Sequence, residues 1–180
     1  MGRCYSEIDQ SLADFISQQH VFFVATAPSA RGHINLSPKG LDSFRILNPR
    51  TVAYVDLIGS GVETIAHAKE NGCIVLMFCA FQGPPKILRL HGMARVLEPR
   101  DAEFSELARS FPSYDSARSI IMAEITRIST SCGYGVPLMK YEGERPQLFA
   151  WAQRKGPEGL SAYKREKNAR SIDGLPGLAE

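Results

Sequence analysis

The sequence lacks long apolar runs and a strong net charge. No stretch of the 180 residues approaches the run of about eighteen apolar residues that a membrane-spanning helix needs. The opening "MGRCYSEIDQ" has no apolar signal core. Lysine and arginine (21) exceed aspartate and glutamate (19) by only two, so bulk charge does not indicate a nucleic-acid or membrane-surface partner. We therefore expect no nucleic acid and no membrane among its partners.

The sequence also lacks a metal-binding or disulfide pattern. Its four cysteines show neither paired metal spacing nor the density of a disulfide scaffold, and its histidines lack ligand-like spacing. Cys73 and Cys79 share a parity within one apolar segment, which is typical of reduced core thiols. We therefore expect a cytoplasmic protein without a metal site.

What the sequence does contain is a series of short segments with strand and helix periodicity. The first, 6–19, has apolar residues at 8, 12, 15 and 16 and predicts an amphipathic helix capped by Ser6. Further helices are expected at 61–72, ending at Gly72, at 99–111, and near 159–170. The β-branched and aromatic segments predict six strands, at 20–27, 33–40, 50–57, 73–81, 85–99 and 117–132.

These elements predict a mainly β fold with peripheral helices, arranged as a small antiparallel barrel decorated at its rim. Segment 73–81, "CIVLMFCAF", is nearly all apolar and is expected to be buried on both faces. The chain is divided into a barrel domain, 1–132, and an extension, 133–180, that is rich in glycine and proline yet too apolar for simple disorder. We expect this extension to pack over the barrel or over a dimer partner.

Five segments in one order carry a resemblance: "INLSPKG", "TVAYVD", "GVETIAHAKENG", "CIVLMF" and "ILRLHGMARVL". Over residues 8–131 the chain resembles the pyridoxamine 5′-phosphate oxidase-like family of FMN-binding split barrels. Its extension is similar to that of an uncharacterised bacterial branch. The resemblance implies a six-stranded split β-barrel that forms a homodimer, with two flavin mononucleotides (FMN) at the dimer interface.

The resemblance also implies an oxidoreductase that exchanges electrons with a small-molecule donor or acceptor, while the flavin does the redox chemistry. Two departures from the family pattern argue against true pyridoxamine phosphate oxidase activity. Ile34 stands where the family has an arginine, and Thr64 and Ile65 stand where an Arg-Lys pair is expected. The substrate is not indicated.

The segment "SPKG" is the first expected contact for the FMN phosphate. Lys39 supplies a cation, Gly40 lets the backbone approach closely, and Pro38 fixes the local backbone beside Ser37. The start of the helix near residue 62 is the second, because free amides and the helix dipole favour an anion there. Its candidate residues are Ser60, Gly61 and Thr64.

The flavin ring needs an apolar slab and hydrogen-bond partners for its pyrimidine edge. Tyr54, Val55 and Asp56, on the strand before the helix, are expected to line the ring pocket. Arg89 and His91 share one face of a later strand, where a guanidinium can stabilise the reduced ring. Trp151, a lone tryptophan in the extension, is a candidate to cap the flavin or to lock the dimer.

Plainer readings remain open at this point. Lys39 is also explained as a solvated charge at the edge of a sheet, and "GSGVET" as an ordinary capped helix start. The alternatives in function are a deazaflavin-dependent reductase, a non-catalytic flavin- or haem-binding dimer with His91 or His67 as haem ligand, and a dimer without any cofactor.

Overall fold

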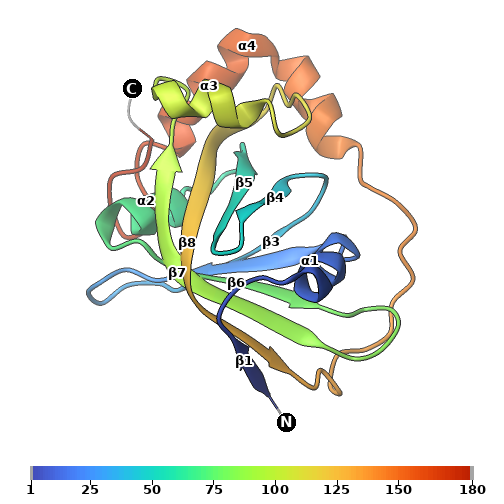
Figure 1. The fold of residues 1–180 in the computed structure, drawn as a ribbon. Helices are drawn as coiled ribbons and strands as arrows, with labels where there is room; N and C mark the ends of the chain where they lie inside the picture. Colours follow the sequence, from blue (N-terminus) through green and yellow to red (C-terminus); the bar gives the residue numbers. More distant parts are fainter. Residues whose placement is uncertain (1, 179–180) are drawn as a thin grey trace.

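The computed structural model describes residues 2–178 and consists of one antiparallel sheet that curves into a split barrel (Figure 1). The strand order is β3-β2-β6-β7-β8-β5-β4, and β1 pairs with β8. The strands are β1 (Arg3–Tyr5), β2 (Phe22–Thr26), β3 (Asn35–Lys39), β4 (Phe44–Asn48), β5 (Thr51–Leu57), β6 (Cys73–Cys79), β7 (Ile87–Leu97) and β8 (Ala117–Ser131). The predicted fold class is confirmed, and all six expected strands are present.

The long strands β7 and β8 form the spine of the barrel. β8 pairs with β7 over most of its length, while its first half also pairs with β5 and its last part with β1. The β7–β8 ladder is irregular between His91 and Gly92. A Cβ atom at Gly92 would collide with the main-chain oxygen of Glu124, so the close approach of the two strands requires glycine here.

The barrel is split because β3 and β4 stand at the two ends of the strand order and do not pair with each other. The apolar alternation of β2, β6, β7 and β8 fills the interior, where Val24, Leu76, Leu88 and Leu90 have no exposed surface.

Helix α1 (Gln10–Ser17) packs on the barrel through Leu12, Phe15 and Ile16, as its periodicity predicts. The expected cap at Ser6 is wrong. The helix starts later, and the carboxylate of Asp9 accepts a hydrogen bond from the Leu12 amide at 2.8 Å.

Three further helices lie around the rim: α2 (Glu63–Glu70), α3 (Ala102–Ala108) and α4 (Gln147–Lys167). α2 is followed by Gly72 at φ +75°, the left-handed stop that the sequence indicates. α4 is longer than the predicted helix near 159–170 because it joins two helical segments across a kink at Gly156 (φ 63°), just before Pro157, and the predicted helix lies in the second segment. Within residues 2–178, no helix combines the length and the apolar content needed to cross a membrane.

Two expectations about the strands need correction. Short strands β1 and β4 were not predicted, because three and five residues of mixed polarity give little periodic signal. The prediction that segment 73–81 is buried on both faces is wrong in this chain, because Val75 and Met77 of β6 are only half-buried and Cys73 is exposed. Cys79 is a buried free thiol as predicted, and Cys73 is not a core residue.

The extension leaves β8, runs along one side of the barrel without regular structure over 133–146, and then forms α4 across the rim (Figure 1). Its last part, 168–178, returns to α2. There the Lys69 ammonium of α2 donates to the Gly177 carbonyl, and the Ile172 amide donates to the carboxylate of Glu63 at 3.2 Å. The extension thus ends against the helix whose start was predicted to bind phosphate.

Candidate functional site

A buried ion cluster lies where the edge strand β3 faces the end of β5. The side chain of Lys39, the last residue of β3, turns toward the barrel, and its Nζ lies 2.7 Å from Oδ1 of Asp56. The second carboxylate oxygen, Oδ2, accepts a hydrogen bond from Nε of Arg118 on β8 at 2.8 Å. Two cations from two different strands therefore share one carboxylate.

Burial makes this cluster electrostatically strong. The Asp56 and Arg118 side chains are 0% and 5% exposed, and Lys39 is 20% exposed. Burial alone raises the pKa of Asp56, but the charges and hydrogen bonds of Lys39 and Arg118 outweigh it and hold that pKa below its ordinary value. Asp56 is ionised at neutral pH, so the cluster carries one net positive charge, and its accessible end is Lys39.

Arg118 also fixes the loop that leads into α2. Its Nη1 donates to the carbonyl oxygens of Gly61 (2.8 Å) and Gly59 (3.4 Å), and Asn168 of the extension donates to the same Gly59 carbonyl at 3.0 Å. The loop therefore turns two carbonyls toward the Arg118 guanidinium. Ser60 and Gly61 themselves are exposed. The carbonyl groups of Gly59 and Gly61 are therefore already hydrogen-bonded within the protein.

A chain of polar side chains continues from the cluster along the inner face of β3. Asn35 donates to the hydroxyls of Thr64 (2.9 Å) and Thr26 (3.2 Å), and Ser37 donates to Asn35 at 2.9 Å. The Thr26 hydroxyl also bonds Nδ1 of His67 at 2.9 Å. This network ties α2 to the two strands of the first hairpin. It explains why Thr64 is buried rather than available at the surface.

Two buried polar groups lie beside this network: the Tyr54 hydroxyl, next to Thr64, and Nε2 of His67, which has no hydrogen-bond partner within residues 2–178. Burial raises the pKa of Tyr54 well above its ordinary value, and the nearby Asp56 charge adds to this shift. Tyr54 is therefore a neutral phenol at physiological pH. His67 has no exposed surface, so it does not offer a nitrogen to a haem in this conformation.

Other predicted site residues lie on the opposite, outer face of the same sheet. Pro38 of β3 pairs with Phe23 of β2, Phe23 pairs with Met77 of β6, and Met77 pairs with Arg89 of β7, so these four side chains form one row. The guanidinium of Arg89 donates to Ser131 at 3.1 Å. The row is apolar over three strands and ends in a cation.

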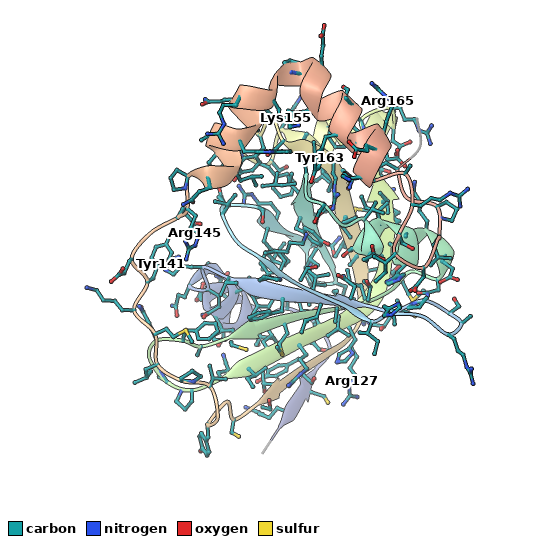
Figure 2. All side chains as sticks on the ribbon, turned by 180° about the vertical axis from the view of Figure 1, so that it is seen from behind. Arg127, Tyr141, Arg145, Lys155, Tyr163 and Arg165 are labelled. Atoms are coloured by element: carbon teal, nitrogen blue, oxygen red, sulfur yellow. The ribbon has the colours of Figure 1, made fainter. Side chains whose placement is uncertain are left out.

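His91 belongs to the next row of this outer face, opposite Arg127 of β8. Partial burial lowers the pKa of His91, and the positive charges of Arg127 and Arg89 lower it further. The histidine is therefore neutral at pH 7. Figure 2 shows Arg127 low on the sheet, far from α4.

Val55 and Trp151 lie away from both groups. Val55 points to the other side of β5 from Tyr54 and packs in the apolar cluster beneath α3. Trp151 packs edge-on against Tyr163 within α4, at 5.0 Å between ring centres, and near Ile58. A single chain thus brings Ser37, Lys39, Tyr54, Asp56 and Thr64 together on the inside and Pro38, Arg89 and His91 on the outside, while Gly40 lies just beyond the end of β3.

Sequence reasoning missed two residues of the inner group, Asn35 and Arg118. Arg118 stands in "ARSIIMA", where a charged residue opens an otherwise apolar strand and so indicates a buried partner. Asn35 lies in "INLSPKG" but had no assigned role. The part of the chain that the structure describes contains no group of three or more His, Cys, Asp or Glu side chains arranged to hold a metal ion.

A sequence profile of the pyridoxamine 5′-phosphate oxidase family matches residues 8–132, which contain the barrel from α1 to the end of β8 but not β1. The pyridoxamine 5′-phosphate oxidase family protein ustO of Aspergillus flavus is 39% identical over 191 aligned residues. That match covers 97% of this chain and 77% of ustO, so it extends through most of the extension.

Solved structures give the same fold at lower identity. HupZ of Group A Streptococcus superposes with a TM-score of 0.54 at 23% identity and covers 67% of this chain and 91% of its own. An FAD-binding protein of Mesorhizobium loti superposes with a TM-score of 0.52 at 13% identity and covers 72% of this chain and 96% of its own. The matched profile and the fungal relative show that the chain belongs to the pyridoxamine 5′-phosphate oxidase family.

Proposed function

We propose that this protein binds FMN at a homodimer interface and acts as a flavin-dependent oxidoreductase that is not a pyridoxamine phosphate oxidase. The observation that carries the proposal is the buried ion cluster, in which Lys39 and Arg118 share the single carboxylate of Asp56. Family membership and the FAD-binding protein of the same fold support a flavin as ligand. The physiological electron donor or acceptor is outside the proposal.

The inner group fits the phosphate of FMN. The phosphate carries close to two negative charges, and the cluster offers one uncompensated positive charge whose accessible end is Lys39. Ser37 lies two residues before Lys39 on the same inner face of β3 and adds a hydroxyl. The family's arginine position is Ile34 here and is 78% exposed, so the positive charge of this site comes from the cluster of Lys39, Asp56 and Arg118.

The outer group fits the flavin ring only with a second chain. Phe23, Met77 and Pro38 provide an apolar strip, and Arg89 ends the row with a guanidinium, but this face is open in one protomer. When bound there, the isoalloxazine supplies the redox chemistry. The role of this chain is to bind and orient the ring, to exclude water from it, and to hold a positive charge near its pyrimidine edge.

The same outer face supports a homodimer. β6 has apolar residues on both of its faces, yet only one face is covered within the chain, and exposed Leu36 on β3 and Met93 on β7 extend the uncovered area. A half-covered strand with continuous apolar sequence is typical of an interface between subunits. Association of two copies would bury the second face of β6 that the sequence predicts to be buried.

The dimer is tested by Met77→Lys, which places a charge in the middle of the outer face. We expect the variant to elute as a folded monomer in size-exclusion chromatography with light scattering, whereas the wild type elutes as a dimer. Ile172→Lys, at an exposed position of the extension, is the matched control and should remain dimeric. A monomeric wild type, or a Met77→Lys variant with an intact dimer, contradicts this part of the proposal.

The phosphate contact is tested by Lys39→Ala, which leaves the cluster without net charge. Because charge-assisted hydrogen bonds contribute about 1.5–3 kcal/mol, we expect FMN affinity to fall by about tenfold or more. Lys167→Ala removes an exposed lysine paired with Glu166 and should leave the affinity unchanged. Lys39→Arg keeps the charge and should retain most of the binding. Equal FMN affinity in wild type and a folded Lys39→Ala variant contradicts the assignment.

A further inference from the structure

A second positively charged feature lies on the rim, where α4 and the end of the extension meet the ends of β7 and β8. A cavity of about 230 Å³ opens there. It is lined by Glu98, Pro99, Arg100, Arg118, Lys164, Arg165, Ala169 and Leu178. Figure 2 shows Arg165 in the second half of α4, on the side where the chain returns toward α2. None of these residues except Arg118 belongs to the inner or outer group described above.

Among the described residues that line this cavity, the charges are unbalanced. Four of its lining residues are cations and one, Glu98, is an anion. Glu98 already accepts a hydrogen bond from the Lys69 ammonium at 2.6 Å. Arg118 directs Nε and Nη1 toward Asp56 and the loop before α2, and within residues 2–178 its Nη2 makes no hydrogen bond. Arg118 is 5% exposed, so this donor is held in a nearly buried position.

Lys164 is the residue for which this imbalance matters most. Its side chain is half-buried, and no ion pair is found for it within residues 2–178. Burial lowers the pKa of Lys164, and the positive charge of Arg118 lowers it further. Within residues 2–178, Arg118 pairs with Asp56, and Lys39 already shares that carboxylate. A further cation beside this guanidinium is therefore unfavourable unless an anion lies near both of them.

We propose that this cavity binds a small oxyanion, phosphate or the phosphate group of an organic ligand, between Arg118 and Lys164, with Arg100 and Arg165 at its mouth. The volume lies below the range of about 300–1,000 Å³ that is typical of sites for drug-sized ligands. It suits a phosphate group or a small phosphorylated molecule rather than a whole flavin mononucleotide. Arginine with a free N–H beside a lysine is a common arrangement for phosphate recognition in proteins.

The proposal does not depend on flavin binding, although Arg118 connects the two features. Its Nε bonds Asp56 in the cluster that includes Lys39, its Nη2 makes no hydrogen bond within residues 2–178, and the residue also lines the cavity. Free phosphate and the phosphate group of a nucleotide would be recognised by the same side chains. The experiment therefore distinguishes which of these two ligands the cavity binds.

The test is thermal unfolding and isothermal titration calorimetry of the full chain with inorganic phosphate, at an ionic strength held constant with chloride. We expect a saturable rise in melting temperature and a one-site binding isotherm. Lys164→Met keeps an apolar stem and removes the charge, so it should abolish both effects. Lys167→Met, three residues further along α4 and outside the cavity, is the matched control and should behave like the wild type.

A flat phosphate isotherm for the wild type overturns the proposal whether or not any variant folds. So does an equal response of wild type and Lys164→Met. If phosphate binding is lost in Lys164→Met while FMN affinity is retained, the site takes a free oxyanion or another phosphorylated ligand. If Lys164→Met loses affinity for both phosphate and FMN but not for riboflavin, the site takes the flavin phosphate. If FMN binds neither the wild type nor any variant, the phosphate titration still tests the cavity. The proposed flavin binding and the proposed oxyanion site can therefore be contradicted independently.

Discussion

The barrel and the C-terminal extension are held in place by different forces. In the barrel, every strand is part of a continuous ladder, and side chains such as Leu76 and Leu90 are fully buried. Between 133 and 146, the Met139 amide donates a hydrogen bond to the Phe81 carbonyl. The ring of Tyr141 stacks on that of His20, with 3.6 Å between the ring centres. Figure 2 shows Tyr141 and Arg145 on this segment, which leads up to the start of α4.

The end of the extension, by contrast, is fixed by polar contacts to α2 and to the loops around it. Asn168 is fully buried and donates a hydrogen bond to the Gly59 carbonyl, and the Lys69 ammonium donates to the Gly177 carbonyl. The carboxylate of Asp173 forms a hydrogen bond with the ring of His33, in the loop between β2 and β3. Apolar periodicity therefore specifies the barrel, whereas a few polar pairs specify where the extension ends. That end is structurally part of the candidate site.

The largest expected effect comes from the ion cluster of the barrel. Asp56→Asn leaves Lys39 and Arg118 without a counter-charge, so we expect the free energy of unfolding to fall by about 3–5 kcal/mol. Chemical denaturation measured at neutral pH checks this. Glu103→Gln removes the partner of Arg95 at an exposed position and should have no measurable effect. Similar losses in the two variants would mean that the buried cluster has no special role.

The same cluster predicts a pH dependence. Because the pKa of Asp56 is lowered in the folded state, its contribution to stability is present above the ordinary carboxylate pKa and is lost as the pH falls through the folded value. The wild type should therefore lose stability more steeply than Asp56→Asn below about pH 4. Parallel pH profiles of the two proteins would contradict the pairing.

An intermediate effect is expected in the extension. A Cβ at Gly177 would collide with the Asn168 carbonyl and lie 2.9 Å from Val62, so Gly177→Ala must displace the end of the extension. We expect a loss of about 1–3 kcal/mol in the free energy of unfolding. Gly135→Ala, where no atom lies within 4 Å of the added Cβ, is the matched control in the same extension. A harmless Gly177→Ala would show that the extension is not tightly docked.

The smallest effect is expected at the exposed pair of His33 and Asp173. The hydrogen bond and the negative charge of Asp173 raise the pKa of His33. Any stability from the pair is present below the ordinary histidine pKa and disappears as the pH rises through the raised value. Asp173→Asn should return the His33 pKa toward its ordinary value in an NMR titration, with little change in stability. An unchanged titration would place the end of the extension away from His33.

Much of the barrel follows from sequence because its strands repeat every two residues. The hairpin of β2 and β3, the pair of β6 and β7 and the long β8 all lie where the alternation predicts them. β4 was missed because its five residues show no clear alternation in burial. The segment of α4 before Gly156 was not predicted, whereas the break indicated by Gly156 and Pro157 is present as a non-helical residue between two helical segments.

The candidate site was predictable only in part. Strand parity separates Lys39 from Pro38, and so it indicates that "SPKG" presents residues to two faces. The partner of Lys39 was not predictable, because Asp56 lies on a strand that does not pair with β3 and Arg118 lies 62 residues beyond Asp56. Contacts between strands that are distant in sequence depend on how the barrel closes, which no local pattern encodes.

The measurement that tests the central claim most directly is an absorbance spectrum of the freshly purified protein, followed by titration with FMN, a deazaflavin and haem. We expect bands of an oxidised flavin, or saturable FMN binding at one per subunit, that weakens in Lys39→Ala. Tighter binding of the deazaflavin or of haem than of FMN would contradict the choice of cofactor. A colourless protein that binds none of the three would contradict the proposed function as a whole.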